Sequence, residues 1–213
     1  MIGQGVLRQC LLDPSIRHVV SIVRSPTGQQ HVKLTELVHK DFLDYSAIES
    51  QLTDYDACFF CLGVSSSGMT EESYSRVTYD VTMAAADTLV RLNPSMTFIY
   101  VSGTGTDSSE KGRTMWARVK GKTENALLHL PFKAAYMFRP GVIQPLHGIQ
   151  SKTPSYRIIY AFAKPLFPLL KLLFPNYIST TEDLGRVMIR VAKGGFPKPI
   201  LENRDISKVS RDL

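Results

Sequence analysis

Short apolar runs alternate with longer segments of helical periodicity along this chain. The runs, rich in β-branched and aromatic residues, span 19–23, 36–39, 57–62, 97–101 and 134–138. Runs of this length between helical segments are typical of buried parallel strands joined by crossover helices. The alternation predicts a doubly wound α/β sheet, whose ligands bind beyond the carboxyl ends of the strands.

Two helices and an N-terminal helical segment are predicted between these runs. Residues 1–12 form an amphipathic segment that Asp13 and Pro14 end. Thr70 caps a helix that Asn93 and Pro94 end. The apolar positions of this helix recur at helical spacing: Tyr74, Val77, Val81, Ala84, Ala85, Thr88, Leu89 and Leu92. The apolar positions of a later helix do the same: Trp116, Val119, Thr123, Ala126, Leu127 and Leu130.

Length and cysteine content bound the class of protein. The 213 residues, 44% of them hydrophobic, suffice for one well-buried domain, and no repeat or linker divides them. Three cysteines leave an odd thiol, and no leader sequence is recognisable, so we expect a cytoplasmic protein.

The charge is unevenly distributed. Residues 1–106 hold 7 Lys and Arg against 11 Asp and Glu, and residues 107–213 hold 18 against 8, so their net charges are −4 and +10. A basic half is typical of a surface that binds a phosphorylated cofactor, a nucleic acid or an acidic membrane. The alternative is a solvated surface without a partner, and charge alone favours this alternative. No nucleic-acid-binding motif accompanies it, so we expect no nucleic-acid partner.

The most apolar stretch of the chain covers residues 156–174. Three basic residues and two prolines interrupt it, so it lacks the roughly 18 consecutive apolar residues of a membrane span. We interpret it as part of a small C-terminal helical lid, roughly residues 145–180, over a substrate cleft. Contact with a membrane surface is the weaker alternative.

Candidate ligand-binding residues follow the first strands. Gly3 and Gly5 begin a helix, where glycines let the backbone approach a pyrophosphate. Arg24 and Ser25 follow the 19–23 run, where an arginine favours the 2′-phosphate of NADP over the 2′-hydroxyl of NAD. An exposed arginine without a ligand is the competing interpretation.

The next two runs extend this series. Asp41 is positioned to accept a hydrogen bond from an adenine amino group, or else caps a helix, and Phe42 lines the same pocket. The small segment Leu62, Gly63 and Val64 lets a dinucleotide cross the strand tip. Cys58 and Cys61 face opposite sides of a strand, which excludes a shared metal or disulfide and indicates buried thiols.

The hydroxyl groups of Ser102, Thr104 and Thr106 follow the fourth run, and Trp116 and Lys120 lie four residues apart on the next helix. With these, four local patterns together resemble the short-chain dehydrogenases/reductases of the NAD(P)-binding, epimerase-like branch, which have a Rossmann fold. They are MIGQG for the end of the glycine loop, VSGTGTD, WARVKGKTE for the YxxxK helix, and FRPGVIQP. STTEDLGRVM resembles a late helix start of the family, and the resemblance runs from residue 1 to about Asp205.

This resemblance implies roles for individual residues. Gly3 would be the last glycine of the loop, and Lys120 would bind the nicotinamide ribose. Ser102 or Thr104 would be the family's catalytic hydroxyl, depending on the alignment. The nicotinamide would be walled by Pro140, Gly141, Val142 and Ile143.

The chain departs from the family pattern twice. It begins at what would be the last residues of the glycine loop, so the family's first strand is missing from the middle of the sheet and two edges should be unpaired. The position of the catalytic tyrosine is Trp116, whose indole N–H donates a hydrogen bond but does not titrate as a phenol does.

These observations predict an NADP(H)-binding oxidoreductase or epimerase-like protein acting on an apolar small molecule, with NAD as the alternative cofactor. Ser102, Thr104 or water would relay the proton. Trp116 favours the alternative, a catalytically silent NAD(P)-binding regulator, and a chain that binds no dinucleotide is the third outcome. The open sheet edge leaves self-association open. Five isolated histidines and the absence of a G-x-S-x-G elbow argue against a metal site and a serine hydrolase.

Overall fold

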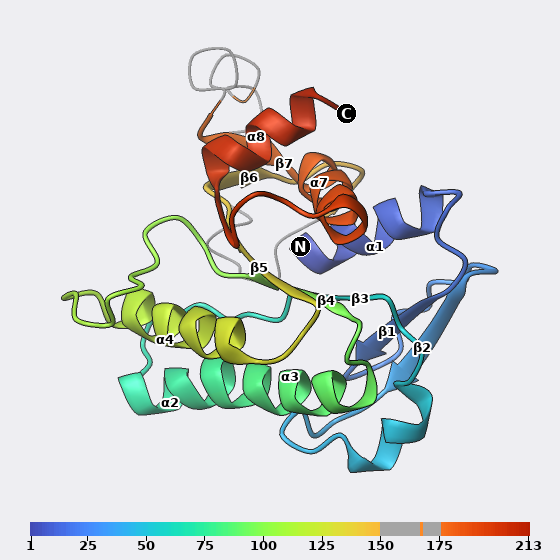
Figure 1. The fold of residues 1–213 in the computed structure, drawn as a ribbon, viewed down its shortest axis with the longest axis horizontal. Helices are drawn as coiled ribbons and strands as arrows, with labels where there is room; N and C mark the ends of the chain where they lie inside the picture. The colour runs from blue at the N-terminus through green and yellow to red at the C-terminus, as the bar shows by residue number, and fades with distance from the viewer. Residues whose placement is uncertain (150–166, 168–175) are drawn as a thin grey trace.

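Parallel strands form the middle layer of the molecule, and helices cover both of its faces (Figure 1). The computed structural model describes residues 1–149, Phe167 and residues 176–213. The strands are β1 (Val19–Val23), β2 (Leu34–Val38), β3 (Ala57–Phe60), β4 (Thr97–Val101), β5 (Ala134–Arg139), β6 (Val142–Gln144), β7 (Ile178–Thr180) and β8 (Ile200–Glu202). The helices are α1 (Ile2–Leu12), α2 (Glu71–Ser75), α3 (Val81–Leu92), α4 (Met115–His129), α7 (Thr181–Gly194) and α8 (Asn203–Arg211), with a 3₁₀ helix at Ser46–Gln51 and a π turn at Arg76–Asp80.

The sheet is divided where the missing strand was expected. One sheet has the order β3-β4-β5-β8, and a separate pair contains β1 and β2. β1 bonds only to β2, and β3 bonds only to β4, so each has one unpaired edge within the described chain. All strand pairs are parallel, as predicted. The fold is therefore Rossmann-like, with a central break.

Local sequence determines most of the elements. The Thr70 hydroxyl accepts a hydrogen bond from the backbone N–H of Ser73 (3.2 Å), and Asn93 ends α3, so both predicted ends are confirmed. A π turn that the pattern did not show separates α2 from α3. Two strand boundaries were wrong: β2 lies at Leu34–Val38 and not 36–39, and β3 ends at Phe60 and not at residue 62.

Two hydrophobic clusters lie on opposite faces of the sheet, and successive residues of β4 alternate between them. Phe98 and Tyr100 pack into the cluster beside α3, while Ile99 and Val101 pack into the cluster beneath α1 and α7. Cys58 packs against the first cluster and Cys61 against the second, so the prediction of opposite faces is confirmed. Both cysteines are half-buried, and desolvation raises the pKa of their thiols to about 12, as expected of unreactive cysteines.

The predicted lid lies mostly outside the described residues. The apolar stretch 156–174 is also outside them, except for Phe167, which is buried. β6, which precedes this stretch in the sequence, pairs with β7, which follows it. None of the helices in the described ranges is long and apolar enough to cross a membrane.

Candidate functional site

The predicted ligand-binding residues follow the carboxyl ends of five strands. Arg24 and Ser25 follow β1, Asp41 and Phe42 follow β2, and the segment 62–64 follows β3. Ser102 follows β4, and Pro140 follows β5. Because strands of a parallel sheet end on the same side, each sheet presents its residues at one edge.

Arg24 and Phe42, predicted at the adenosine end, lie together. The guanidinium carbon of Arg24 is 5.8 Å from the centre of the Phe42 ring, within cation–π range. Phe42 is held in turn against His39 and Tyr45, at ring distances of 6.0 and 6.2 Å. Ser25 beside Arg24 is exposed.

Asp41 does not cap a helix, which was the alternative predicted from the sequence, because it lies in a turn between β2 and the 3₁₀ helix at Ser46–Gln51. Its Oδ1 accepts a hydrogen bond from the backbone N–H of Leu43 at 3.0 Å, which closes a tight turn. The residue is exposed, so its second carboxylate oxygen still faces solvent. Contact with adenine therefore remains a prediction.

Packing accounts for the glycines of α1. A Cβ atom on Gly5 would lie 2.6 Å from the carbonyl oxygen of Thr181, and one on Gly3 would lie 3.3 Å from Cβ of Cys61. Gly185 of α7 is equally confined, at 2.8 Å from Gln9. Gly5 and Gly185 thus allow α1 and α7 to approach closely. Gly63, by contrast, faces open space.

The three predicted hydroxyl groups all bind protein atoms. Ser102 Oγ donates to Glu124 Oε1 at 2.5 Å and lies 3.2 Å from the carbonyl oxygen of Phe138. Thr106 Oγ1 donates to the carbonyl of Gly103 at 2.8 Å. Ser102 and Thr106 are both buried. Thr104 is exposed, and its longer bond to the Arg139 carbonyl measures 3.2 Å. Thr104 is therefore the hydroxyl most open to a ligand.

Lys120 lies on α4, and its side chain reaches the backbone that follows β4. Its Nζ donates to the Ser102 carbonyl at 2.5 Å. Burial lowers its pKa to about 8, although the negative charge of Glu124 one turn later opposes this shift. Trp116, one turn before Lys120, faces Gly105, where an added Cβ would lie 3.4 Å from the indole ring. The amine and the indole thus flank the loop that carries Thr104.

Sequence reasoning missed the buried ion pair at the centre of this region. Glu124 has no exposed surface, and it pairs with Arg139 through Nε at 3.0 Å and through a shorter bond to Nη2. Arg139 also bonds to Ser108 and to Glu202 of β8. The only sequence signal was that Glu124 lies one helical turn after Lys120. This ion pair joins the ends of β4, β5 and β8.

The segment after β5 is held by its neighbours. The backbone N–H of Gly141 donates to Asn203 Oδ1 at 2.8 Å, and the Pro140 carbonyl accepts from the Thr104 N–H at 2.9 Å. Val142 is 51% exposed, whereas Ile143 is buried. Their role as a nicotinamide wall stays a prediction. In the described chain, no group of three His, Cys, Asp or Glu residues is arranged to hold a metal ion.

Two curated proteins are similar in sequence. "Protein fmp52, mitochondrial" of Emericella nidulans is 22% identical over 196 residues, which cover 89% of this chain and 82% of that protein. "Botcinic acid biosynthesis cluster B protein 16" of Botryotinia fuckeliana is 31% identical over 106 residues, 46% of this chain and 66% of that protein. No model of a known protein family matches the chain.

Solved structures share the fold. The dTDP-glucose 4,6-dehydratase DesIV of Streptomyces venezuelae, with NAD bound, has a TM-score of 0.66 at 16% identity, covering 99% of this chain and 77% of that one. The WbmF enzyme of Bordetella bronchiseptica, in complex with NAD+, has a TM-score of 0.64 at 13% identity, covering 99% and 74%. The chain thus has the Rossmann fold of NAD-binding dehydrogenases and epimerases.

Proposed function

We propose that this chain, which has the fold of the short-chain dehydrogenases and epimerases, binds NADP(H) as a single domain and acts as an oxidoreductase or epimerase-like enzyme on an apolar small molecule. The observation that carries the proposal is Lys120, held by Ser102 at the end of β4 beside the exposed hydroxyl of Thr104. Arg24 and Phe42 at the end of the β1–β2 pair provide the adenosine end.

The side chains suit the two ends of a dinucleotide. Arg24 has no carboxylate partner within the described chain, so its guanidinium is available to a 2′-phosphate beside the Phe42 ring. Lys120 would bind the nicotinamide ribose, and the segment 140–143 would face the ring. Between them, Gly3 and the segment 62–64 would border the pyrophosphate. When bound, the cofactor supplies hydride chemistry.

The residues of this chain would move the proton. Lys120, with a pKa near 8, exists in both protonation states around neutral to mildly basic pH, which suits a general acid or base. Thr104 offers an exposed hydroxyl to a substrate oxygen. Ser102 is less available, because Glu124 and the Phe138 carbonyl occupy its hydroxyl. We therefore assign Ser102 a supporting role, in which its own backbone carbonyl accepts the hydrogen bond from Lys120.

A catalytically silent NAD(P)-binding regulator is the second candidate. Trp116 favours it, because an indole in the predicted tyrosine position supplies no titrating phenol. Steady turnover with any carbonyl substrate would exclude it. If turnover exists, Thr104→Val should reduce kcat by about 100-fold, within the range of a lost general acid–base group. Ser102→Ala should lower it less.

Fluorescence of Trp116, the only tryptophan, tests cofactor binding directly. NADPH should quench it saturably and bind more tightly than NADH. Arg24→Ala should remove this preference, with about a tenfold loss for NADPH, the size of one charge-assisted contact. Arg17→Ala, also exposed but at the opposite end of β1, is the matched control. Absence of quenching by either cofactor in folded protein would refute the proposal.

We further propose a cytoplasmic location, because all three cysteines are free thiols. Self-association through the unpaired edges of β1 and β3 is an extension of the same proposal. Sedimentation of the purified chain would measure it, with a monomer at all concentrations as the contrary result.

A further inference from the structure

The two C-terminal helices each carry a row of exposed basic side chains. On α7 the row is Arg186, Arg190 and Lys193, and on α8 it is Arg204, Lys208 and Arg211. Both rows have the spacing i, i+4 and i+7, which places each on one face of its helix. The opposite faces of both helices are buried in the core. We call the six residues the basic face.

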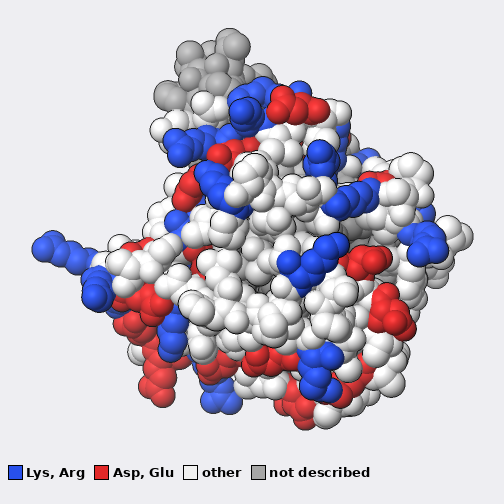
Figure 2. Space-filling view, viewed as in Figure 1, with Lys and Arg blue, Asp and Glu red and all other residues white. Residues whose placement is uncertain are grey.

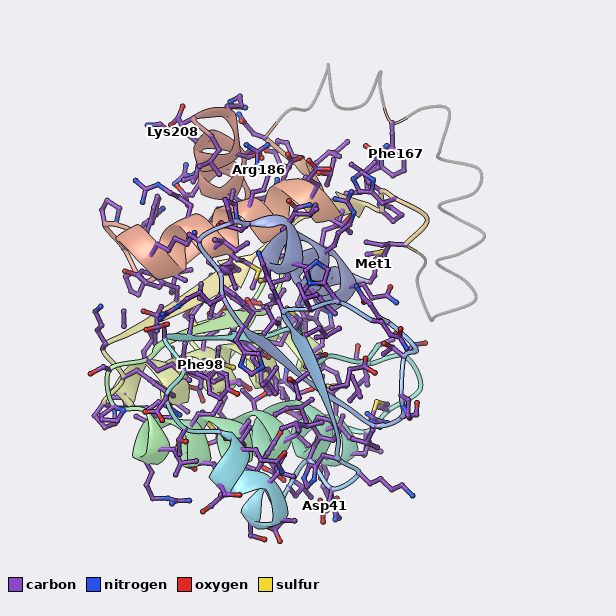
Figure 3. All side chains as sticks on the ribbon, turned by 90° about the vertical axis from the view of Figure 1, so that its right-hand side faces the viewer. Met1, Asp41, Phe98, Phe167, Arg186 and Lys208 are labelled. Atoms are coloured by element: carbon purple, nitrogen blue, oxygen red, sulfur yellow. The ribbon has the colours of Figure 1, made fainter. Side chains whose placement is uncertain are left out.

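The two rows adjoin each other. Ser210 of α8 donates to Asp183 of α7 at 2.9 Å, and a shallow depression is lined by Arg190 together with Val209 and Leu213. The last turns of α8 therefore cross α7 beside its arginines. Figure 2 shows basic side chains gathered over these helices, in the upper part of the view. Figure 3 shows Arg186 and Lys208 at the end of the molecule opposite Asp41.

Most of these cations lack a protein partner. Arg186, Arg190, Arg204 and Lys208 form no hydrogen bond or ion pair with any residue in the described ranges. Lys193 pairs with Asp13 at 2.8 Å, and Arg211 contacts the Asn176 side chain at 3.4 Å.

Carboxylates nearby neutralise part of this charge. Asp205 pairs with Lys198 at 2.7 Å, and Glu182 contacts His147 at 2.6 Å. Asp183 accepts from the Ser210 hydroxyl, while Asp212 is exposed at the end of α8. Residues 176–213 hold seven Lys and Arg against five Asp and Glu, so this part of the chain has a net charge of +2.

Exposed apolar side chains border these cations. Tyr177 is 67% exposed and Leu213 is 47% exposed. Tyr177 lies beside α8, because the carbonyl of the preceding residue, Asn176, accepts from Asn203 at 2.7 Å. Cations beside an exposed tyrosine and leucine are the composition of membrane-interface surfaces, where aromatic rings lie at the head-group level.

We propose that the basic face binds the surface of an anionic lipid membrane. A membrane suits it better than a nucleic acid, because mobile head groups can adapt to two crossing rows of cations, and because leucine adds nothing to phosphate recognition.

Co-sedimentation with vesicles tests the proposal. The full chain should bind phosphatidylcholine vesicles with 30% phosphatidylserine, should not bind pure phosphatidylcholine, and should be released by 0.5 M NaCl. Replacing Arg186, Arg190, Arg204 and Lys208 together by Gln should weaken binding at least 100-fold, since each cation near such a surface contributes about fivefold. Tyr177→Ser should weaken it several-fold without changing its salt dependence.

A matched variant removes the same charge elsewhere. Arg17, Arg76, Arg113 and Lys133 are exposed and lie outside the basic face, and their joint replacement by Gln should lower binding far less. Equal losses in the two variants would overturn the proposal, as would no vesicle binding by the wild-type chain. Tighter binding to a DNA duplex than to the vesicles at the same salt would also overturn it. Circular dichroism and Tm show that the variants remain folded.

Discussion

β4 and β1 are both five-residue apolar parallel strands, yet they differ in burial. Every residue of β4 is buried, whereas every residue of β1 is only half-buried. β4 has paired strands on both sides and a hydrophobic cluster on each face. Within the described chain, β1 pairs only with β2, and its inner edge is open. A strand's sequence thus sets its propensity, while its neighbours set how much it contributes to stability.

The candidate site spans both environments. Lys120 and Ser102 depend on the buried four-stranded sheet, and Arg24 and Phe42 depend on the β1–β2 pair. The link between the pair and the rest of the molecule includes Lys33, whose Nζ donates to the carbonyls of Leu11 and Asp13 at 3.2 and 2.7 Å. We therefore expect the proposed nicotinamide end to be rigid and the proposed adenosine end to be less firmly held.

Truncation of one core residue in each sheet should show the largest difference. Phe98 of β4 has no exposed surface and lies 5.0 and 6.0 Å from the ring centres of Phe132 and Phe60. Phe98→Ala should lower the free energy of unfolding by about 4 kcal/mol. Val20→Ala in half-buried β1 should lower it by about 1 kcal/mol. Urea titrations measure both, and equal losses would contradict the comparison.

Removal of one buried charge should have the next largest effect. Arg139→Met leaves Glu124 buried without its cation and should cost about 3 kcal/mol. Glu124→Leu combined with Arg139→Met should recover much of this loss, because no lone charge remains. In the β1–β2 pair, Glu36 accepts a hydrogen bond from the backbone N–H of exposed Thr27 at 3.1 Å. Glu36→Gln should therefore cost at most about 1 kcal/mol. A larger cost for Glu36→Gln than for Arg139→Met would reverse the ranking.

Amide hydrogen exchange should separate the two strands without any mutation. Amides of β1 should exchange on the order of 100-fold faster than those of β4, because a two-stranded pair with an open edge opens locally without unfolding the larger sheet. Exchange measured by NMR at Ile22 and Ile99 compares one apolar residue in each strand. Similar protection at both would show that the two sheets unfold as one unit.

The pH dependence of stability tests the amine of Lys120. The folded-state pKa of Lys120 is lowered to about 8 from its usual 10.5, so between these values the unfolded state binds the extra proton. The Lys120 contribution to stability therefore rises with pH across this window. Lys120→Met removes it. The difference between the two unfolding curves should grow from pH 8 to 10.5 in favour of the wild type, and a constant difference would contradict the lowered pKa. Subtracting the variant also removes the opposing titration of the buried thiols.

Local sequence signals predicted the secondary-structure elements but not the tertiary contacts between them. Alternation identified five strands, and Thr70 and Asn93 marked helix ends, because capping and periodicity act within a few residues. The positions after the strands singled out Arg24 and Phe42, and the resemblance of its segment to the YxxxK helix singled out Lys120; their roles stay predictions. The sequence could not show that Glu124 occupies the Ser102 hydroxyl, since the partners are 22 residues apart.

The glycines and the basic rows show the same limit. Gly5 is a weak phosphate-loop signal in the sequence, and only its distance to Thr181 in the fold identifies a helix contact. Each basic row follows from helical spacing, but the crossing of α8 over α7 is what joins the rows into one surface.

The sequence by itself determined five of the described strands, the helices between them and the division of charge along the chain, and it predicted a break in the middle of the sheet. The tertiary structure decided which hydroxyls are free, which charges are buried and where the further strands β6, β7 and β8 pair. The physical reason is range: propensity, capping and periodicity act between near neighbours in the chain, whereas desolvation and ion pairing depend on atoms that only folding brings together.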